Sequence, residues 1–179
     1  MDTQLCPFGP FLVTLRKKTK IPQWLLAART EVTPANLRKI ERGFTKPGVM
    51  LALRLLRAVT HDVGTKIQLF CSQQEISPRS PQYIPDTIPK SDCLPHFRNT
   101  TNGSVCLFGL WLKEVRLAYH VPQKQIAELA GYHLRNMYEV EHGRREPSVT
   151  TALELVCGIG CDIAWFFDCL NNVDKTNAD

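Results

Sequence analysis

The chain has 179 residues, of which 44% are hydrophobic and 22% are charged, and its formal net charge is +5. This composition fits one medium or two small folded domains and excludes a fibrous or wholly disordered chain. No apolar run approaches the roughly 18 residues that span a bilayer. The first basic cluster follows an apolar patch, the reverse of a secretory signal. We therefore expect a cytoplasmic protein without a membrane segment.

The first part of the chain recurs one hundred residues later. When residues 6–70 are laid over 106–170 without a gap, seventeen positions are identical. The phrase IERGFTKPGV, for example, matches VEHGRREPSV. A match of this length indicates two copies of one small domain. Residues 71–105, rich in Pro, Ser, Thr and Asn, predict a linker, and residues 171–179 predict a frayed tail.

Each copy predicts helices and no strand. The stretches FGPFLVTLRKKT and FGLWLKEVRLAY have apolar residues at helical spacing, so each predicts an amphipathic first helix. A short second helix follows Pro22 or Pro122, because proline suits a first helical turn. The third helix is expected at 34–42 and 134–142. In the first copy Thr33 is its expected N-cap.

The predicted third helix ends at a glycine, Gly43 or Gly143, which suits the left-handed residue after a helix. An apolar fourth helix follows the next proline. A fifth and shorter helix is expected after Asp62 in the first copy and after Asp162 in the second. The expected fold is all-α, with two tandem five-helix domains.

The seven cysteines include no C-x-x-C pair. In a reducing compartment this pattern predicts free and mostly buried thiols. Cys157 and Cys161 would share a helix face, but no second close pair or nearby histidine accompanies them. We therefore expect no metal site and no cofactor.

Two short helices joined by a tight turn, then E-x-G-x-x-x-P and an apolar helix, resemble the lambda repressor/Cro-like (xenobiotic-response-element) helix-turn-helix family. In the second copy QKQIAELAGYHLRNMYEVEHGRREPS matches that motif almost throughout. The resemblance places Ala127 where the second and third helices touch and Gly131 in a turn that needs a positive φ. It also implies a core that includes Val121, Ile126, Met137 and Val140.

The first copy departs from the family pattern in two places. Glu31 replaces the turn glycine, which costs about 1 kcal/mol if the positive φ is kept. Trp24 and Leu25 stand where the family has polar surface. The same fold is expected, with a turn that is either strained or distorted.

The resemblance also implies an ion pair between the first and third helices of each copy. Its members are Arg16 and Glu41 in the first copy, and Arg116 and Glu141 in the second. An arginine–carboxylate fork would fix the angle between the two helices. We favour a purely structural role for these pairs.

In this family the third helix enters the major groove of double-stranded DNA. Arginine can bind guanine there, apolar side chains can meet a thymine methyl group, and polar or basic neighbours can bind phosphates. The expected DNA-binding residues of the first copy are Gln23, Ala35, Asn36, Arg38, Lys39, Arg42 and Lys46. Those of the second copy are Gln123, Leu134, Arg135, Asn136, Tyr138, Glu139, Arg144 and Arg145.

The two copies differ in net charge. Residues 8–70 hold twelve Lys or Arg against three Asp or Glu, a net of +9, whereas residues 108–170 hold six against eight, a net of −2. A small domain with nine excess positive charges is suited to a polyanion. Charge therefore favours the first copy as the main DNA reader, and similarity to the motif favours the second.

The leading hypothesis is a sequence-specific DNA-binding transcriptional regulator that represses by occlusion, with two units reading adjacent half-sites. A flexible linker of about 36 residues spans roughly 30–36 Å, close to the 34 Å of one helical turn of DNA. An enzyme is not expected, because the histidines are scattered and no catalytic arrangement is present.

The alternative is a protein-interaction module, antitoxin-like or adaptor, on the same scaffold. Trp24, Leu25 and Glu139, on or near the expected DNA side, favour this second hypothesis. The sequence also allows a homodimer, with contacts through Trp24 and Leu25 or through the aromatic run at residues 165–167. For that aromatic run, packing in the domain core is favoured over an interface.

Overall fold

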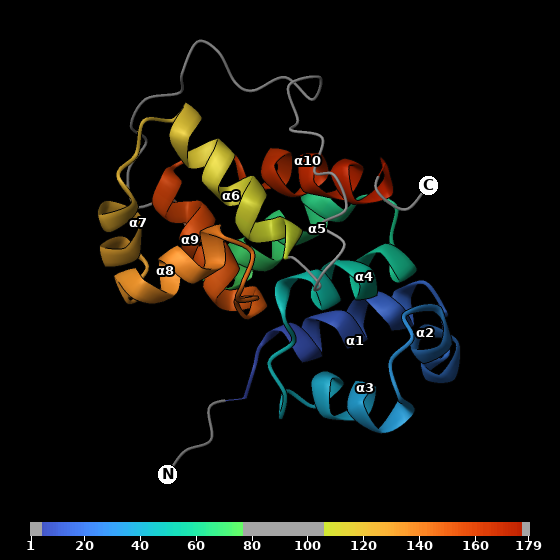
Figure 1. Cartoon of the computed structure of the whole chain (residues 1–179). Coiled ribbons are helices and arrows are strands. Elements are labelled where there is room, and N and C mark those ends of the chain that lie inside the picture. Colours follow the sequence, from blue (N-terminus) through green and yellow to red (C-terminus); the bar gives the residue numbers. More distant parts are fainter. Residues whose placement is uncertain (1–4, 77–105, 177–179) are drawn as a thin grey trace.

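The computed structural model describes residues 5–76, which we call the first half, and residues 106–176, which we call the second half (Figure 1). These two segments contain ten helices and no strand, so the expected all-α fold with two sets of five helices is confirmed. The helices of the first half are α1 (Phe8–Lys18), α2 (Gln23–Arg29), α3 (Pro34–Glu41), α4 (Val49–Val59) and α5 (Val63–Gln73). Those of the second half are α6 (Leu107–Ala118), α7 (Gln123–Leu129), α8 (Leu134–Glu141), α9 (Val149–Ile159) and α10 (Ile163–Thr176).

The ends of the third helices follow the local sequence. Thr33 caps α3 by accepting a hydrogen bond from the backbone N–H of Asn36 at 3.3 Å. After the helix Gly43 has φ +77°, and Gly143 at the equivalent position after α8 has φ +68°. Glycine takes this left-handed conformation without strain, so both helices end where the sequence predicts.

The fifth helices are longer than expected. α5 has 11 residues, as many as α4, and α10 has 14. Helix α5 therefore continues through residues 71–73, which the sequence had assigned to the linker. Helix α10 likewise extends past residue 170 into the expected tail. Residues 77–105 of the expected linker lie outside the described residues.

The first and third helices of each half touch at a glycine. A Cβ atom added to Gly9 would fall on the carbonyl oxygen of Ile40, and one added to Gly109 would fall on that of Val140. The absence of a side chain allows α1 to approach α3, and α6 to approach α8, at backbone distance. This close approach gives a physical reason for the same glycine in both copies.

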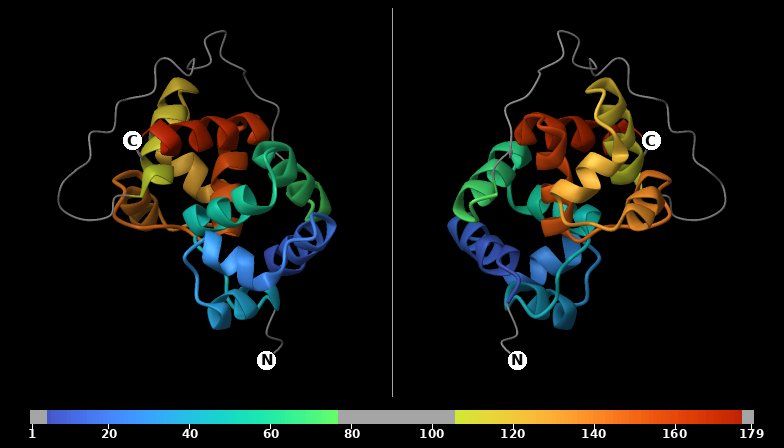
Figure 2. Two further views of the ribbon diagram at one scale, coloured as in Figure 1. Left: turned by 90° about the vertical axis from the view of Figure 1, so that its right-hand side faces the viewer. Right: turned by 90° about the vertical axis from the view of Figure 1, so that its left-hand side faces the viewer.

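The two halves pack directly against each other. Helices α5 and α10 lie side by side, and α4 lies against α9 (Figures 1 and 2). Between them Gly48 and Ser148 form an antiparallel bridge, in which Val49 N donates to Pro147 O and Val149 N donates to Pro47 O, both at 3.0 Å. These contacts join equivalent segments, as in a twofold-symmetric dimer. The two halves are therefore related by direct contacts as well as by the linker, contacts that the sequence did not predict.

Two further contacts break this symmetry. Asp168 Oδ1 accepts a hydrogen bond from Gly64 N at 2.9 Å, and Glu146 Oε1 accepts one from Met50 N at 2.8 Å. A Cβ atom on Gly64 would lie 2.6 Å from the carbonyl oxygen of Ala164, so glycine is required on that side. The pairing thus uses different residues on its two sides.

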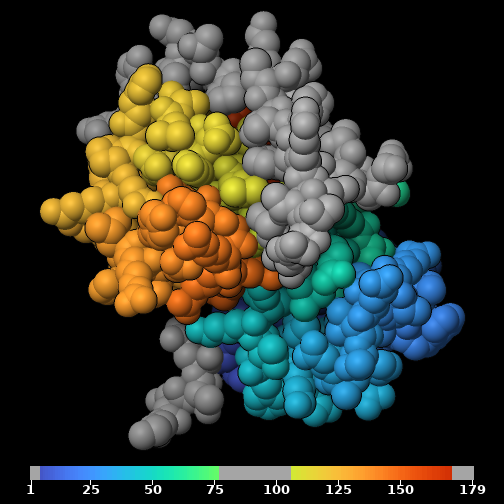
Figure 3. Space-filling model, in the orientation of Figure 1, coloured from blue at the N-terminus to red at the C-terminus, as the bar shows by residue number. Residues whose placement is uncertain are grey.

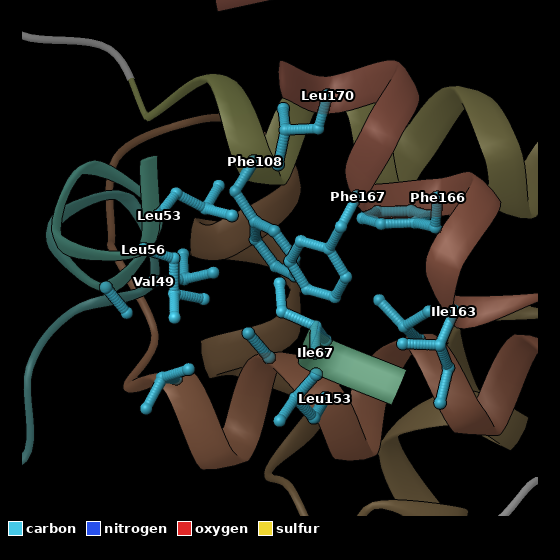
Figure 4. Close-up of a cluster of buried hydrophobic side chains, with 14 of the residues drawn as sticks. Val49, Leu53, Leu56, Ile67, Phe108, Leu153, Ile163, Phe166, Phe167 and Leu170 are labelled. Carbon is cyan, nitrogen blue, oxygen red and sulfur yellow. The ribbon is translucent and has the colours of Figure 1, made fainter. Parts of the chain in front are cut away.

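One hydrophobic core runs through both halves. Figure 4 shows Leu53 and Ile67 of the first half gathered with Phe108 and Phe167 of the second. Phe166 and Phe167 are fully buried, so core packing is confirmed for these two residues of the aromatic run. This core, however, is shared between the halves and is not confined to one domain.

The expected core of the second half is largely correct. Ile126, Met137 and Val140 are fully buried, and Ala127 is buried where α7 meets α8. Val121 is only half-buried, because it lies in the loop before α7 and packs against the edge of the core. In the part of the chain that the structure describes, no helix has both the length and the apolar character needed to cross a bilayer.

Candidate nucleic-acid interface

Helix α3 presents a basic surface to solvent. Leu37 and Ile40 are fully buried on its inner side, which turns Arg38, Lys39 and Arg42 outward. Ala35, Asn36 and Lys46 are exposed as well. All the expected DNA-binding residues of the first half except Gln23 are therefore open to a partner. The surfaces of this segment and of α8 are both visible in Figure 3, with other parts of the chain between them.

A fork-shaped ion pair lies beneath this surface. Arg16 Nε donates to Glu41 Oε1 at 2.7 Å, and Arg16 Nη2 donates to Glu41 Oε2 at 3.3 Å. The remaining Nη1 donates to the carbonyl oxygen of Ile21 at 3.0 Å. The guanidinium group therefore joins α1, α3 and the loop before α2.

The second half has the same arrangement. Arg116 Nε and Nη2 donate to the two carboxylate oxygens of Glu141 at 2.6 and 3.0 Å. Arg116 Nη1 donates to Val121 O at 3.0 Å. Both expected ion pairs are thus present in the structure, and both carboxylates are buried.

The glutamine at the start of the second helix completes each ion pair. Gln23 Nε2 donates to Glu41 Oε2 at 2.6 Å, and Gln123 Nε2 donates to Glu141 Oε2 at 2.9 Å. Gln23 Oε1 also accepts from Arg38 Nε at 3.4 Å. Sequence reasoning missed these links, although the identical spacing of Arg, Gln and Glu in both copies was a signal for them.

Helix α8 presents a mixed surface. Leu134, Arg135 and Tyr138 are exposed, whereas Glu139 and Asn136 are half-buried. The two cations after the helix have acidic or amide partners. Arg144 Nη1 lies 3.8 Å from Glu139 Oε1, and Arg145 Nη1 donates to Asn136 Oδ1 at 2.9 Å. The surface of α8 therefore offers less free positive charge than that of α3.

An aromatic contact adds to the surface of α8. The ring centroids of Tyr138 and His142 lie 3.9 Å apart, and His142 Nδ1 is 2.8 Å from Tyr138 O. This contact holds Tyr138, which remains exposed, in one place on the helix. A fixed and exposed ring is suited to apolar contact with a partner.

Two large apolar side chains near α3 are exposed to solvent. Trp24, near the start of α2, is 67% exposed, and Phe44, just after α3, is 66% exposed. Their counterparts in the second half are the cations Lys124 and Arg144. Leu25 is half-buried. Replacing cations by aromatic rings at these positions gives the first half a distinct apolar rim.

The turns between the second and third helices have the same shape in both halves. Glu31 has φ +55°, close to φ +61° at Gly131. The first turn is therefore not distorted, and Glu31 holds a left-handed conformation that favours glycine. Of the two expected outcomes for this turn, a strained or a distorted backbone, the structure shows the strained one.

This strain leads to a matched pair of predictions. Glu31→Gly should raise the free energy of unfolding by about 1 kcal/mol, because it removes the cost of a positive φ. Gly131→Ala should lower it by a similar amount, since no atom lies within 4 Å of the added Cβ and only the backbone is affected. Urea denaturation of both variants measures the effect. An unchanged free energy of unfolding in Glu31→Gly would contradict the conclusion that this turn is strained.

The described cysteines are free and mostly buried. Burial, with a smaller contribution from the Cys157 thiol, raises the pKa of Cys71 to about 12. Burial likewise raises the pKa of Cys161. Near neutral pH these thiols stay protonated, the form that neither attacks substrates nor binds metal well. No group of His, Cys, Asp and Glu in the described ranges is placed to hold a metal ion.

Comparison with protein families bears on the second half. Residues 112–166 match the family model of helix-turn-helix domains. The matched segment runs from the middle of α6 into the start of α10 and includes α7 and α8, the helix pair that places Tyr138 and Arg135 on the surface. This fold is used by DNA-binding transcription regulators. No curated protein and no solved structure matched the chain.

Proposed function

We propose that the chain is a sequence-specific DNA-binding transcriptional regulator that represses by occlusion, with its two halves reading adjacent half-sites. The observation that carries this proposal is the pairing of the halves through equivalent segments, Gly48 with Ser148 and α5 with α10. Such pairing gives two helix-turn-helix units a constant separation. DNA read by paired units has half-sites at a constant spacing of about one helical turn.

The charge of the first half supports a polyanionic partner. Arg38, Lys39, Arg42 and Lys46 are all exposed on α3 or just after it. Phosphate contacts from such side chains supply much of the affinity of proteins for DNA. The α8 surface, with Arg135, Leu134 and Tyr138, is better suited to distinguishing bases than to attracting phosphates.

The test is selection of binding sites from random duplex DNA by the full chain at two salt concentrations. We expect two unlike half-sites with one constant spacing, and weaker recovery at the higher salt. A single short site would show that only one half reads DNA. No enrichment at either salt would overturn the proposal.

Arg38 and Lys39 should contribute differently. Arg38→Ala should weaken binding to the selected site by about 1–3 kcal/mol and relax specificity at one base pair. Lys39→Ala should weaken binding to all sequences alike and reduce the slope of log K against log salt by about one. Fluorescence anisotropy on matched and mismatched duplexes separates the two effects. Equal losses on all duplexes for both variants would exclude base reading by Arg38.

The exposed aromatic pair favours a second candidate function, in which the first half holds a protein. Trp24 and Phe44 are each about two-thirds exposed and replace cations of the second half. Under this alternative, the double variant Trp24→Lys/Phe44→Arg should lose a protein partner and keep or gain DNA affinity. Under the leading proposal, the same variant should gain DNA affinity, and no binding to a protein partner should be lost.

A further inference from the structure

The first half contains a cavity that is separate from the outward face of α3. It measures about 750 Å³ and lies between the ends of α1, α2 and α4. In Figure 1 the end of α4 and helix α2 are at the right. Its lining includes Arg29, Arg54, Arg57 and His61, three threonines and a wall formed by Ile21 and Val59.

The cavity has an excess of positive charge. Three arginines line it, against the single carboxylate of Glu31. Arg54 and Arg57 lie three positions apart on α4, a spacing at which like charges repel on a helix. Arg29 Nη1 donates to the carbonyl oxygen of Ala58, near the end of α4, at 3.4 Å. Arg29 therefore helps to cap the end of α4.

The second half shows that the fold does not require these cations. The positions equivalent to Arg29, Arg54 and Arg57 are Leu129, Glu154 and Cys157, and that of His61 is Cys161. Helix α9 ends instead at Gly160, which has φ +81°. Two copies of one fold thus differ by four basic residues at one place, and only the first copy concentrates them around a cavity.

We propose that this cavity binds a phosphate-bearing organic anion of nucleotide size. Guanidinium groups bind phosphate oxygens in pairs of parallel hydrogen bonds. The hydroxyl groups of Thr19 and Thr30 donate to backbone carbonyls, whereas that of Thr60 accepts from Asp62 N and can donate to a ligand. The volume is within the range of small-ligand sites, which combine apolar walls with a few polar anchors. Ile21 and Val59 provide the apolar wall for a ring or a chain.

The experiment is calorimetric titration of the full chain with magnesium-free ATP as the probe, in the absence of DNA. We expect one site per chain. The double variant Arg29→Ala/Arg54→Ala should weaken ATP binding at least about tenfold, because each guanidinium makes charge-assisted hydrogen bonds. Both side chains are exposed, so the variant is expected to fold; its thermal unfolding curve checks this.

The matched control is Lys17→Ala/Lys66→Ala, which removes the same charge from the first half but no side chain of the cavity lining. ATP affinity close to that of the wild type in this control supports the proposal. An equal loss of ATP affinity in both double variants would show that ATP binds by general charge attraction. That result would overturn the proposal. The absence of ATP binding by the wild type would also overturn it.

A DNA arm separates a small anion from a DNA phosphate in the cavity. The cavity variant should bind a random duplex as the wild type does. If it loses duplex affinity while ATP fails to compete with the duplex, the cavity arginines serve DNA and the proposal is wrong. Failure of site selection would leave this binding test unaffected, so the two proposals stand or fall separately.

Discussion

Glu141→Ala should lower the free energy of unfolding by about 3–5 kcal/mol, because it leaves a largely buried arginine without its carboxylate. The side chain of Glu141 is 2% exposed and that of Arg116 is 12% exposed. Gln123 also loses its acceptor. For a chain of this size the melting temperature should fall by roughly 6–20 °C. Differential scanning calorimetry measures the change.

The control for this prediction is an exposed pair on α7. Lys124 Nζ lies 3.8 Å from Glu128 Oε1, and both side chains are mostly exposed. Glu128→Ala should change stability by less than about 0.5 kcal/mol, since exposed pairs one helical turn apart contribute little. Similar effects of the two substitutions would contradict the structural role assigned to the buried pair.

Phe167→Ala should lower the free energy of unfolding by about 3–5 kcal/mol, because it opens a cavity in the core. Residues of both halves form this core. Phe167 is fully buried, and its ring centroid lies 5.3 Å from that of Phe166 and 6.3 Å from that of Phe108. Since Ile67 of α5 belongs to the same cluster, the first half should lose stability with the second (Figure 4). Chemical denaturation should therefore remain a single transition at a lower midpoint.

The arrangement of the core can be read from the shape of that transition. Leu117→Ala, at an exposed position of α6, is the control and should leave the midpoint nearly unchanged. Two separate transitions in Phe167→Ala, with the first half unfolding at its wild-type midpoint, would show that the halves do not share a core.

Most of the fold within each half follows from local sequence. Thr33, Gly43 and the apolar spacing of α3 and α8 act over a few residues, so helix ends and inward faces were predictable. The ion pair of Arg16 with Glu41 was expected from the resemblance to the helix-turn-helix family, and both copies contain its two residues at the same spacing.

The relation between the halves was not predictable in this way. An apolar residue such as Ile67 or Phe167 has the same pattern whether it packs within its own domain or against the other. The hydrogen bonds from Gly64 to Asp168 and from Met50 to Glu146 join residues about one hundred positions apart, with no periodic signal. The basic cavity was missed for a related reason, since Arg29 and Arg54 come together only after α2 packs on α4.

The bridge between Gly48 and Ser148 has a consequence for how the proposed regulator responds to its own abundance. Repressors made of two identical chains come apart on dilution, so their occupancy of an operator rises more steeply than their amount. Here the partner is always present on the same chain, at an effective concentration that dilution does not change. Occupancy of a two-half-site operator should then rise in simple proportion to the number of chains, even when a cell holds only a few.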